Sequence, residues 1–239
     1  MSFIQPKPMA THDFYGPIHK GLRLAQTQLL VRLGACGGDD DTELSQLLAD
    51  LDAFCLMARH HLENEDRWVH SALEERAPGS TARLEESHAD HRQSFGALHA
   101  LIARVETAVR CDRARRLKQL YLRFSLFMAD DLAHMAEEEE LLLPMLQSLF
   151  TDDELSDIED HILSGLSPDE IVAFGRLMIP AATRADRISL LSAMRANAPA
   201  EAFEAIMAFA ARPSLCDADY VHLCLGLGLP APEPLAAAA

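Results

Sequence analysis

The stretches HLENEDRWVHSAL (residues 61–73) and HMAEEEELLLPML (residues 134–146) repeat one pattern. Each begins with His-x-x-x-Glu, as His61–Glu65 and His134–Glu138, and apolar residues then follow in matching places. On a helix, residues i and i+4 lie on one face, so each pair aims an imidazole and a carboxylate toward the same core. Burying such groups unpaired would be costly. The repeat therefore predicts two core-facing helices that share a bound metal pair.

The composition is that of an ordinary soluble protein, with 49% hydrophobic and 24% charged residues among 239. The formal net charge of −16 argues against binding to nucleic acid or to an anionic membrane surface. The start, MSFIQPKPMATHDFYG, lacks the apolar region of a signal peptide, and no apolar run approaches a membrane span. Five scattered cysteines without C-x-x-C spacing favour reduced thiols. We therefore expect a cytoplasmic protein without nucleic-acid or membrane partners.

The spacing of apolar residues predicts an all-α protein, because they recur at three- and four-residue intervals nearly throughout. Residues 12–150 divide into four long helices with short connections, and glycine or proline marks the first two breaks. This organisation predicts an antiparallel up-down four-helix bundle. The expected helices are Pro17–Gly34, Thr42–Arg76, a third capped by Ser80 or Thr81 that lasts to about Ala108, and Asp112–Phe150.

Three features at the edges of these helices carry further expectations. Pro144 should kink or end the last turn of the fourth helix. The acidic residues Asp39–Asp41 lack EF-hand spacing and are expected to serve a loop and a helix cap. Residues 1–11 are expected to form an N-terminal arm.

Residues 151–239 differ from the bundle in the length of their predicted helices and in their proline content. Shorter helical segments alternate with prolines, and Ser167-Pro168-Asp169-Glu170 combines an N-cap with first-turn acids. We expect a smaller helical C-terminal extension without a ligand motif. It is a candidate surface for a protein partner or a homo-oligomer.

Two more histidines complete the candidate metal site. His19 stands near the start of the first helix, and His88 shares a stripe of the third helix with apolar residues. One ligand set per helix is then expected to converge in the bundle: His19, His61, Glu65, His88, His134 and Glu138. Four imidazoles and two carboxylates suit a pair of borderline metals such as iron or manganese better than structural zinc, calcium or magnesium.

Other polar residues near this set leave alternatives open. His91 is a fifth ligand, an outer partner of the ligands, or neither. Asp131 orients an imidazole from outside the ligand set, or is an ordinary helix acid. His60, His70 and His99 fall off the ligand stripe and are expected to be exposed or amphipathic. The alternative for the two His-x-x-x-Glu pairs is that they form two helix-surface ion pairs or capping pairs.

The doubled motif, with one histidine in each of the other two helices, resembles the hemerythrin-like (HHE cation-binding) superfamily over residues 12–150. The resemblance implies two non-haem iron ions held by the six residues named above, with Glu65 and Glu138 bridging. Arg92 stands where respiratory hemerythrin has a second histidine in helix three, and Glu139 stands at the offset of its aspartate. The pattern is closer to the branch that repairs iron centres under nitrosative stress than to oxygen carriers.

We therefore expect a di-iron protein that binds or senses oxygen, nitric oxide or peroxide, or that handles iron. The coordination position left open by having fewer than five histidines would admit the small molecule. One alternative is a di-iron oxidoreductase acting on peroxide or nitric oxide, and another is an interaction module controlled by its metal state. A ferritin-like site is less favoured, because Glu85-x-x-His88 has no second copy.

Overall fold

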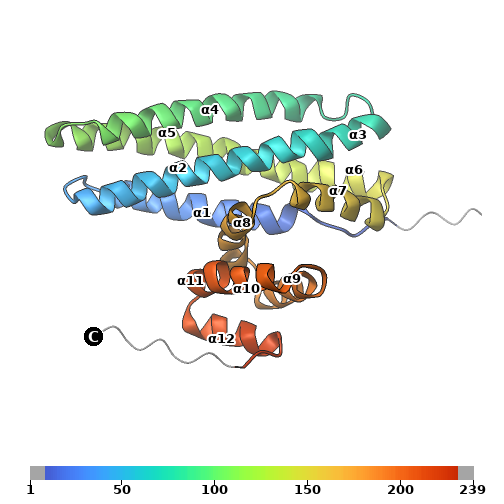
Figure 1. Cartoon of the computed structure of the whole chain (residues 1–239). Helices are drawn as coiled ribbons and strands as arrows, with labels where there is room; N and C mark the ends of the chain where they lie inside the picture. Colours follow the sequence, from blue (N-terminus) through green and yellow to red (C-terminus); the bar gives the residue numbers. More distant parts are fainter. Residues whose placement is uncertain (1–8, 231–239) are drawn as a thin grey trace, which may run out of the picture. The chain divides into compact units, whose positions relative to one another are not determined.

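The protein is described here by a computed structural model, which covers residues 9–230. Every regular element in that range is a helix, so the predicted all-α fold is confirmed (Figure 1). Only residues 9–11 of the expected N-terminal arm fall within the described part of the chain. Among residues 9–230, no helix combines the length and apolar character needed to cross a bilayer.

The chain divides into two compact units, and helix α1 (Tyr15–Ala35) contributes to both. Unit 1 comprises Met1–Gly16 and Ala25–Gly165. Unit 2 comprises Pro17–Leu24 and Leu166–Ala239.

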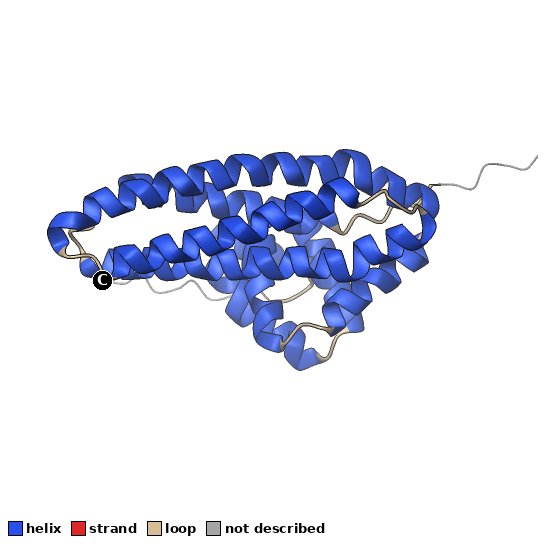
Figure 2. Ribbon diagram, turned by 90° about the horizontal axis from the view of Figure 1, so that it is seen from above, coloured by secondary structure: helices blue, strands red, loops and turns tan. Residues whose placement is uncertain are grey.

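Unit 1 contains the expected bundle of long helices. After α1, its elements are α2 (Asp41–Asn64), η1 (Glu65–His70), α3 (Ser71–Arg76), α4 (Ala82–Glu106), α5 (Arg110–Glu137), η2 (Glu138–Leu142), α6 (Leu143–Leu149) and α7 (Asp152–Ser164). Helix α4 packs against both α2 and α5. Figure 2 shows these long helices side by side, with loops at their ends.

Two of the four long helices are interrupted by a π-helical segment. Segment η1 joins α2 to α3, and η2 joins α5 to α6, so each expected helix continues through a wider turn. We expected Pro144 to kink or end the fourth helix. Instead η2 directly precedes α6, which has Pro144 in its first turn, where the missing N–H of proline is tolerated.

Side chains fix the start of some helices and leave others uncapped. Asp40 accepts from the backbone N–H groups of Thr42 and Glu43, which confirms the predicted helix cap in the acidic loop. Thr81 directly precedes α4, but its hydroxyl donates to Glu74 instead of capping the helix. The prediction that a side chain of Ser80 or Thr81 caps the third helix is therefore wrong, although Thr81 holds the N-cap position.

Aromatic side chains form the middle of the bundle core. Phe54 of α2 meets Phe124 and Phe127 of α5 edge-on, and Phe95 of α4 packs on Phe127. All four are buried. These contacts tie α2, α4 and α5 together next to the histidine-rich level of the bundle.

Helix α7 belongs to unit 1, although we expected the bundle to end near residue 150. Arg76 donates to Glu154 at 2.6 Å, and His161 lies against the Trp68 ring at a centroid distance of 5.0 Å. The predicted boundary between residues 150 and 151 lies before α7. The boundary between the two units lies after Gly165, at the end of α7.

Unit 2 is a set of shorter helices, as expected for the C-terminal part. They are α8 (Pro168–Ala181), α9 (Arg184–Asn197), α10 (Ala200–Ile206), η3 (Met207–Ala211), α11 (Arg212–Ser214) and α12 (Asp217–Gly226). The predicted cap at Ser167 is confirmed, because its hydroxyl accepts from the backbone of Glu170. Gly21 of α1 lacks a side chain where α8 passes, since a Cβ there would lie 2.9 Å from the Leu177 carbonyl oxygen.

Candidate metal centre

The six predicted ligands come together in two groups. One group contains His19, His61 and Glu65, and the other contains Glu65, His88, His134 and Glu138. Within each group, the potential ligand atoms all lie within 4.8 Å of one another. Glu65 belongs to both groups. The two groups of potential ligands therefore share one carboxylate.

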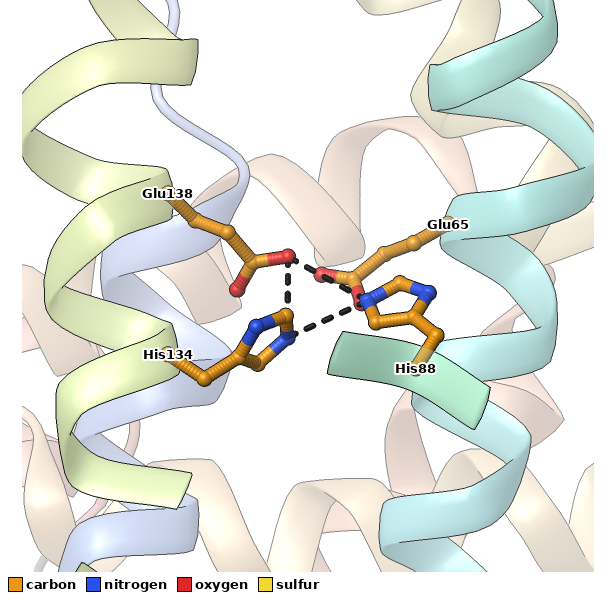
Figure 3. A group of neighbouring side chains, drawn as sticks. All are labelled: Glu65, His88, His134 and Glu138. Atoms are coloured by element: carbon orange, nitrogen blue, oxygen red, sulfur yellow. Dashed lines mark hydrogen bonds and ion pairs between the residues drawn. The ribbon is translucent and has the colours of Figure 1, made fainter. Parts of the chain in front are cut away.

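Figure 3 shows the second group, in which all four side chains point toward one another. His134 Nε2 lies 3.3 Å from a Glu138 oxygen and 3.1 Å from His88 Nε2. His88 Nε2 also lies 3.7 Å from an oxygen of Glu65 and 3.7 Å from one of Glu138. In the first group, His61 Nε2 lies 3.1 Å from Glu65.

Both glutamates stand at the first residue of a π-helical segment. Glu65 opens η1 and Glu138 opens η2, each directly after an α-helix that ends with a His-x-x-x pattern. Single π-helical turns inside α-helices often mark functional sites. The sequence repeat is thus matched by a repeat in backbone geometry at the two carboxylates.

All of the cluster except the half-buried His61 is buried, and burial disfavours the charged forms of its carboxylates. Glu65 and Glu138 are 3% and 0% exposed, and His19 and His88 are 0% exposed. Burial raises the pKa of Glu65 well above its usual value, and the negative charge of Glu138 raises it further. A cation held between these carboxylates would relieve both effects.

Asp66 orients His88 from outside the ligand groups. Its carboxylate lies 2.7 Å from His88 Nδ1 and is also bound by the guanidinium of Arg92. An Nδ1–H donated to Asp66 leaves His88 Nε2 facing the cluster, which is how carboxylates commonly orient metal-binding histidines. Burial lowers the pKa of His88, but the hydrogen bond with Asp66 and the charge of Glu138 outweigh it and raise the pKa.

His70 was expected to be exposed or amphipathic, and this prediction is wrong. Its side chain is 2% exposed and stacks on His88 with ring centroids 4.8 Å apart. His70 lies in η1, where backbone hydrogen bonds run from i to i+5, so it returns to the side of Glu65. An α-helical wheel places this residue on another face.

His91 and Asp131 form a pair beside the cluster but belong to neither ligand group. The ring nitrogen Nδ1 of His91 lies 2.8 Å from the Ser87 carbonyl, and Nε2 lies 3.3 Å from Asp131. Burial lowers the pKa of His91, and the interactions with Asp131 and the Ser87 carbonyl raise it more. The structure therefore places His91 among the neighbours of His134 and not among the clustered ligand atoms.

Tyr15 is a residue near the site that the sequence reasoning missed. It precedes His19 by four residues, one helical turn, and it is 1% exposed. It belongs to one buried cluster with Val69 and Leu142, which each follow a ligand glutamate by four residues. Burial raises the pKa of Tyr15, and the charges of Glu138 and Glu65 raise it further. The phenol is thus an electrostatic neighbour of both carboxylates.

The chemistry of the donor set fits bound metal ions. Neither ligand group contains a lysine or an arginine. The two buried carboxylates can therefore be neutralised within the groups by their own protonation, by imidazolium protons or by a bound cation. Imidazole nitrogens and carboxylate oxygens together are typical ligands of iron, manganese and other divalent first-row metals.

Comparison with known proteins agrees with this geometry. Residues 17–146 match the hemerythrin HHE cation binding domain. F-box/LRR-repeat protein 5 of Xenopus tropicalis is 26% identical over 162 residues, which is 66% of this chain and 23% of that protein. The match thus spans less than a quarter of the length of that relative. Because the matched domain covers more than half of the chain and contains both His–Glu repeats, the chain belongs to the hemerythrin HHE cation-binding family and is a metal-binding protein of hemerythrin-like fold.

Proposed function

We propose that this protein holds two non-haem iron ions and uses them to bind or sense oxygen, nitric oxide or peroxide, or to handle iron. The observation that carries the proposal is the shared place of Glu65 in both ligand groups. One carboxylate common to two adjacent cation positions is the arrangement expected of a carboxylate-bridged metal pair. A lone tetrahedral zinc site would need only one such group.

The number of imidazoles supports a small-molecule ligand. Two histidines belong to each group: His19 and His61 to one, and His88 and His134 to the other. Iron prefers more ligands than this set supplies, so a position is left for water or an exogenous molecule. The bound metal pair would supply redox electrons and that open position.

The protein's own side chains would shape the environment of this position. The buried layer containing Tyr15, Val69 and Leu142 limits water on one side of the carboxylates. The phenol of Tyr15 is an electrostatic neighbour of both carboxylates. Asp66 and Arg92 hold His88 in place from the outside.

Ligand binding and turnover can be separated in one titration. Reduced, iron-loaded protein is mixed anaerobically with nitric oxide, and oxygen and peroxide are tested in parallel. A binding or sensing protein gives a saturable change in the optical spectrum with no continuing consumption. Repeated consumption of peroxide or nitric oxide under a reductant would instead favour the oxidoreductase alternative. No spectral response to any of the three would contradict the proposal.

A second candidate function is control of a protein partner or homo-oligomer by the metal state. Helix α1 supplies His19, and two residues later Gly21 packs against Leu177 of α8. The helix that carries a candidate ligand therefore also builds unit 2. Sedimentation of metal-free and metal-loaded protein tests this function, which predicts a change in oligomeric state.

We also infer that the protein works in the cytoplasm. All five cysteines are free thiols. Burial of the Cys55 thiol raises its pKa to about 12. Such scattered, unpaired thiols are typical of a reducing compartment.

A further inference from the structure

A cavity between α4 and α5 ends at the metal centre. Its volume is about 480 Å³, within the usual range of ligand cavities. His91 and His134 both line it, and His134 is one of the clustered ligand candidates. The cavity therefore gives access to the cluster from one side of the bundle.

The walls of this cavity are strongly acidic. Four carboxylates line it: Glu86, Asp90, Asp130 and Glu137. Glu137 pairs at 3.0 Å with Arg83, which also lines the cavity, whereas in the described part of the chain no cationic side chain forms an ion pair with the other three carboxylates. Several like charges in a cleft attract counter-ions and raise their local concentration. The cavity thus favours cations over anions.

One residue that lines the cavity, His91, forms a buried pair with Asp131. His91 Nε2 is 3.3 Å from one oxygen of Asp131, and the two side chains are 4% and 7% exposed. Among residues 9–230, the second oxygen of Asp131 has no hydrogen-bond partner, and His91 Nε2 has no partner besides this ion-pair contact with Asp131. Buried polar atoms in this state are costly, and a bound ligand is one way to satisfy them.

The pair offers atoms that can bind a metal ion for a short time. Nδ1 of His91 lies 2.8 Å from the Ser87 carbonyl. When the Nδ1–H group donates a hydrogen bond to this carbonyl, Nε2 carries the lone pair that can bind a metal ion. The His91 ring is 4.8 Å from the His134 ring, and the Ser87 hydroxyl lies 3.1 Å from His134 Nδ1. A cation at His91 and Asp131 is therefore one side chain away from the cluster.

We propose that this cavity is the route by which a divalent metal ion reaches the centre, and that His91 and Asp131 form a transfer site along it. The inference rests on the proposed metal pair. The transfer site would hold the ion through one imidazole nitrogen and a carboxylate, with water as the remaining ligands. Only two protein ligands make binding weak, which suits passage to a site with more ligands.

A second cavity, lined by Asp66 and His70, is less suited to this role, although Asp66, His70 and His88 also bring potential ligand atoms together. It has a volume of about 400 Å³ and is lined by Asp66, His70, Glu74, Glu85 and Arg92, among others. Arg92 already occupies the carboxylate of Asp66, and Glu74 accepts from the backbone N–H groups of Gly79 and Thr81. Its carboxylates thus mostly accept hydrogen bonds from other groups of the protein already.

The test measures the rate of metal uptake by the full chain. Metal-free protein is mixed with Co²⁺ in a stopped-flow instrument, and the ligand-field absorption reports loading. The variant Glu86→Gln/Asp90→Asn/Asp130→Asn removes three charges from the cavity. The control Glu106→Gln/Asp157→Asn/Asp160→Asn removes three exposed charges that do not line it.

We expect the cavity variant to load about tenfold more slowly at low ionic strength, with a smaller difference at high salt. Its final metal content should equal that of the wild type. Asp131→Asn should also slow loading, by a factor that salt does not change, because it acts at close range.

Two results would overturn the route. One is a loading rate of the cavity variant equal to that of the wild type, and the other is an equal slowing by the control. In either case a normal final content of two metal ions would leave the proposed metal pair intact. A wild-type chain that takes up no second ion would instead refute the metal pair and the route together.

Discussion

Glu65 and Glu138 occupy equivalent places: each follows a histidine by four residues and opens a π-helical segment. In both helices, the wider π-helical turn therefore begins at the residue that supplies the buried carboxylate. Both carboxylates are almost fully buried next to each other. Metal-free protein therefore keeps two acidic groups in an environment that disfavours their charge.

Glu65→Gln should stabilise the metal-free protein while weakening metal binding. Burial and the charge of Glu138 raise the pKa of Glu65, so ionisation of this group opposes folding at neutral pH. Removing the charge should raise the free energy of unfolding of the metal-free form by about 1 kcal/mol. Denaturant unfolding at neutral pH measures this change.

Glu63→Gln is the matched control, because Glu63 is exposed on the same helix. It should change neither stability nor metal content. An unchanged or lower stability of metal-free Glu65→Gln would contradict the account of strained carboxylates.

Asp66→Ala should weaken metal binding although Asp66 is in neither of the two proposed ligand groups. Its carboxylate fixes His88 through Nδ1 at 2.7 Å. Loss of such an outer contact commonly costs roughly 10- to 100-fold in metal affinity. Competition with a chelator of known affinity measures the loss. Asp66→Asn keeps an acceptor oxygen and should show a smaller effect, whereas equal affinities in all three proteins would show that His88 needs no such support.

The two buried histidines of α4 should respond differently to substitution. His88 contributes to the group with Glu65 and Glu138, and His91 contributes to neither group. His88→Ala should lose at least one iron per chain, while His91→Ala should keep both at equilibrium. Equal iron retention in both variants would mean that α4 supplies no ligand.

Much of the metal centre was predictable, because the i, i+4 spacing of the His-x-x-x-Glu repeat fixes the direction of its side chains on a helix. Two His-x-x-x-Glu pairs on long helices with apolar flanks predict two inward-facing ligand pairs, and the structure brings them together. Tyr15 was also within reach, since it stands one turn before His19 on the same helix face. It was missed because a tyrosine among apolar residues also fits an ordinary core.

Other features could not be predicted from spacing alone. A π-helical turn has no clear signal in composition, so the burial of His70 was missed. The contact of Asp66 with His88 joins two helices and depends on their rotation. The placement of α7 in unit 1 rests on contacts such as Arg76 with Glu154, far apart in the sequence.

Removal of metal should lower the melting temperature without abolishing the helices. Ions that bind only the folded chain add to its stability by mass action. The aromatic core around Phe54, Phe95 and Phe127 does not depend on metal and should keep the bundle helical. Circular dichroism melting with and without a chelator measures both effects, and identical melting temperatures would show that the buried cluster holds no ion.

Metal content is the most direct test of the central claim that Glu65 joins two cation sites. Protein produced with ample iron is analysed for metals per chain, together with the optical spectrum of its oxidised form. The account predicts two irons per chain and near-ultraviolet absorption typical of a bridged ferric pair. One tightly bound zinc per chain, with no iron, would contradict it.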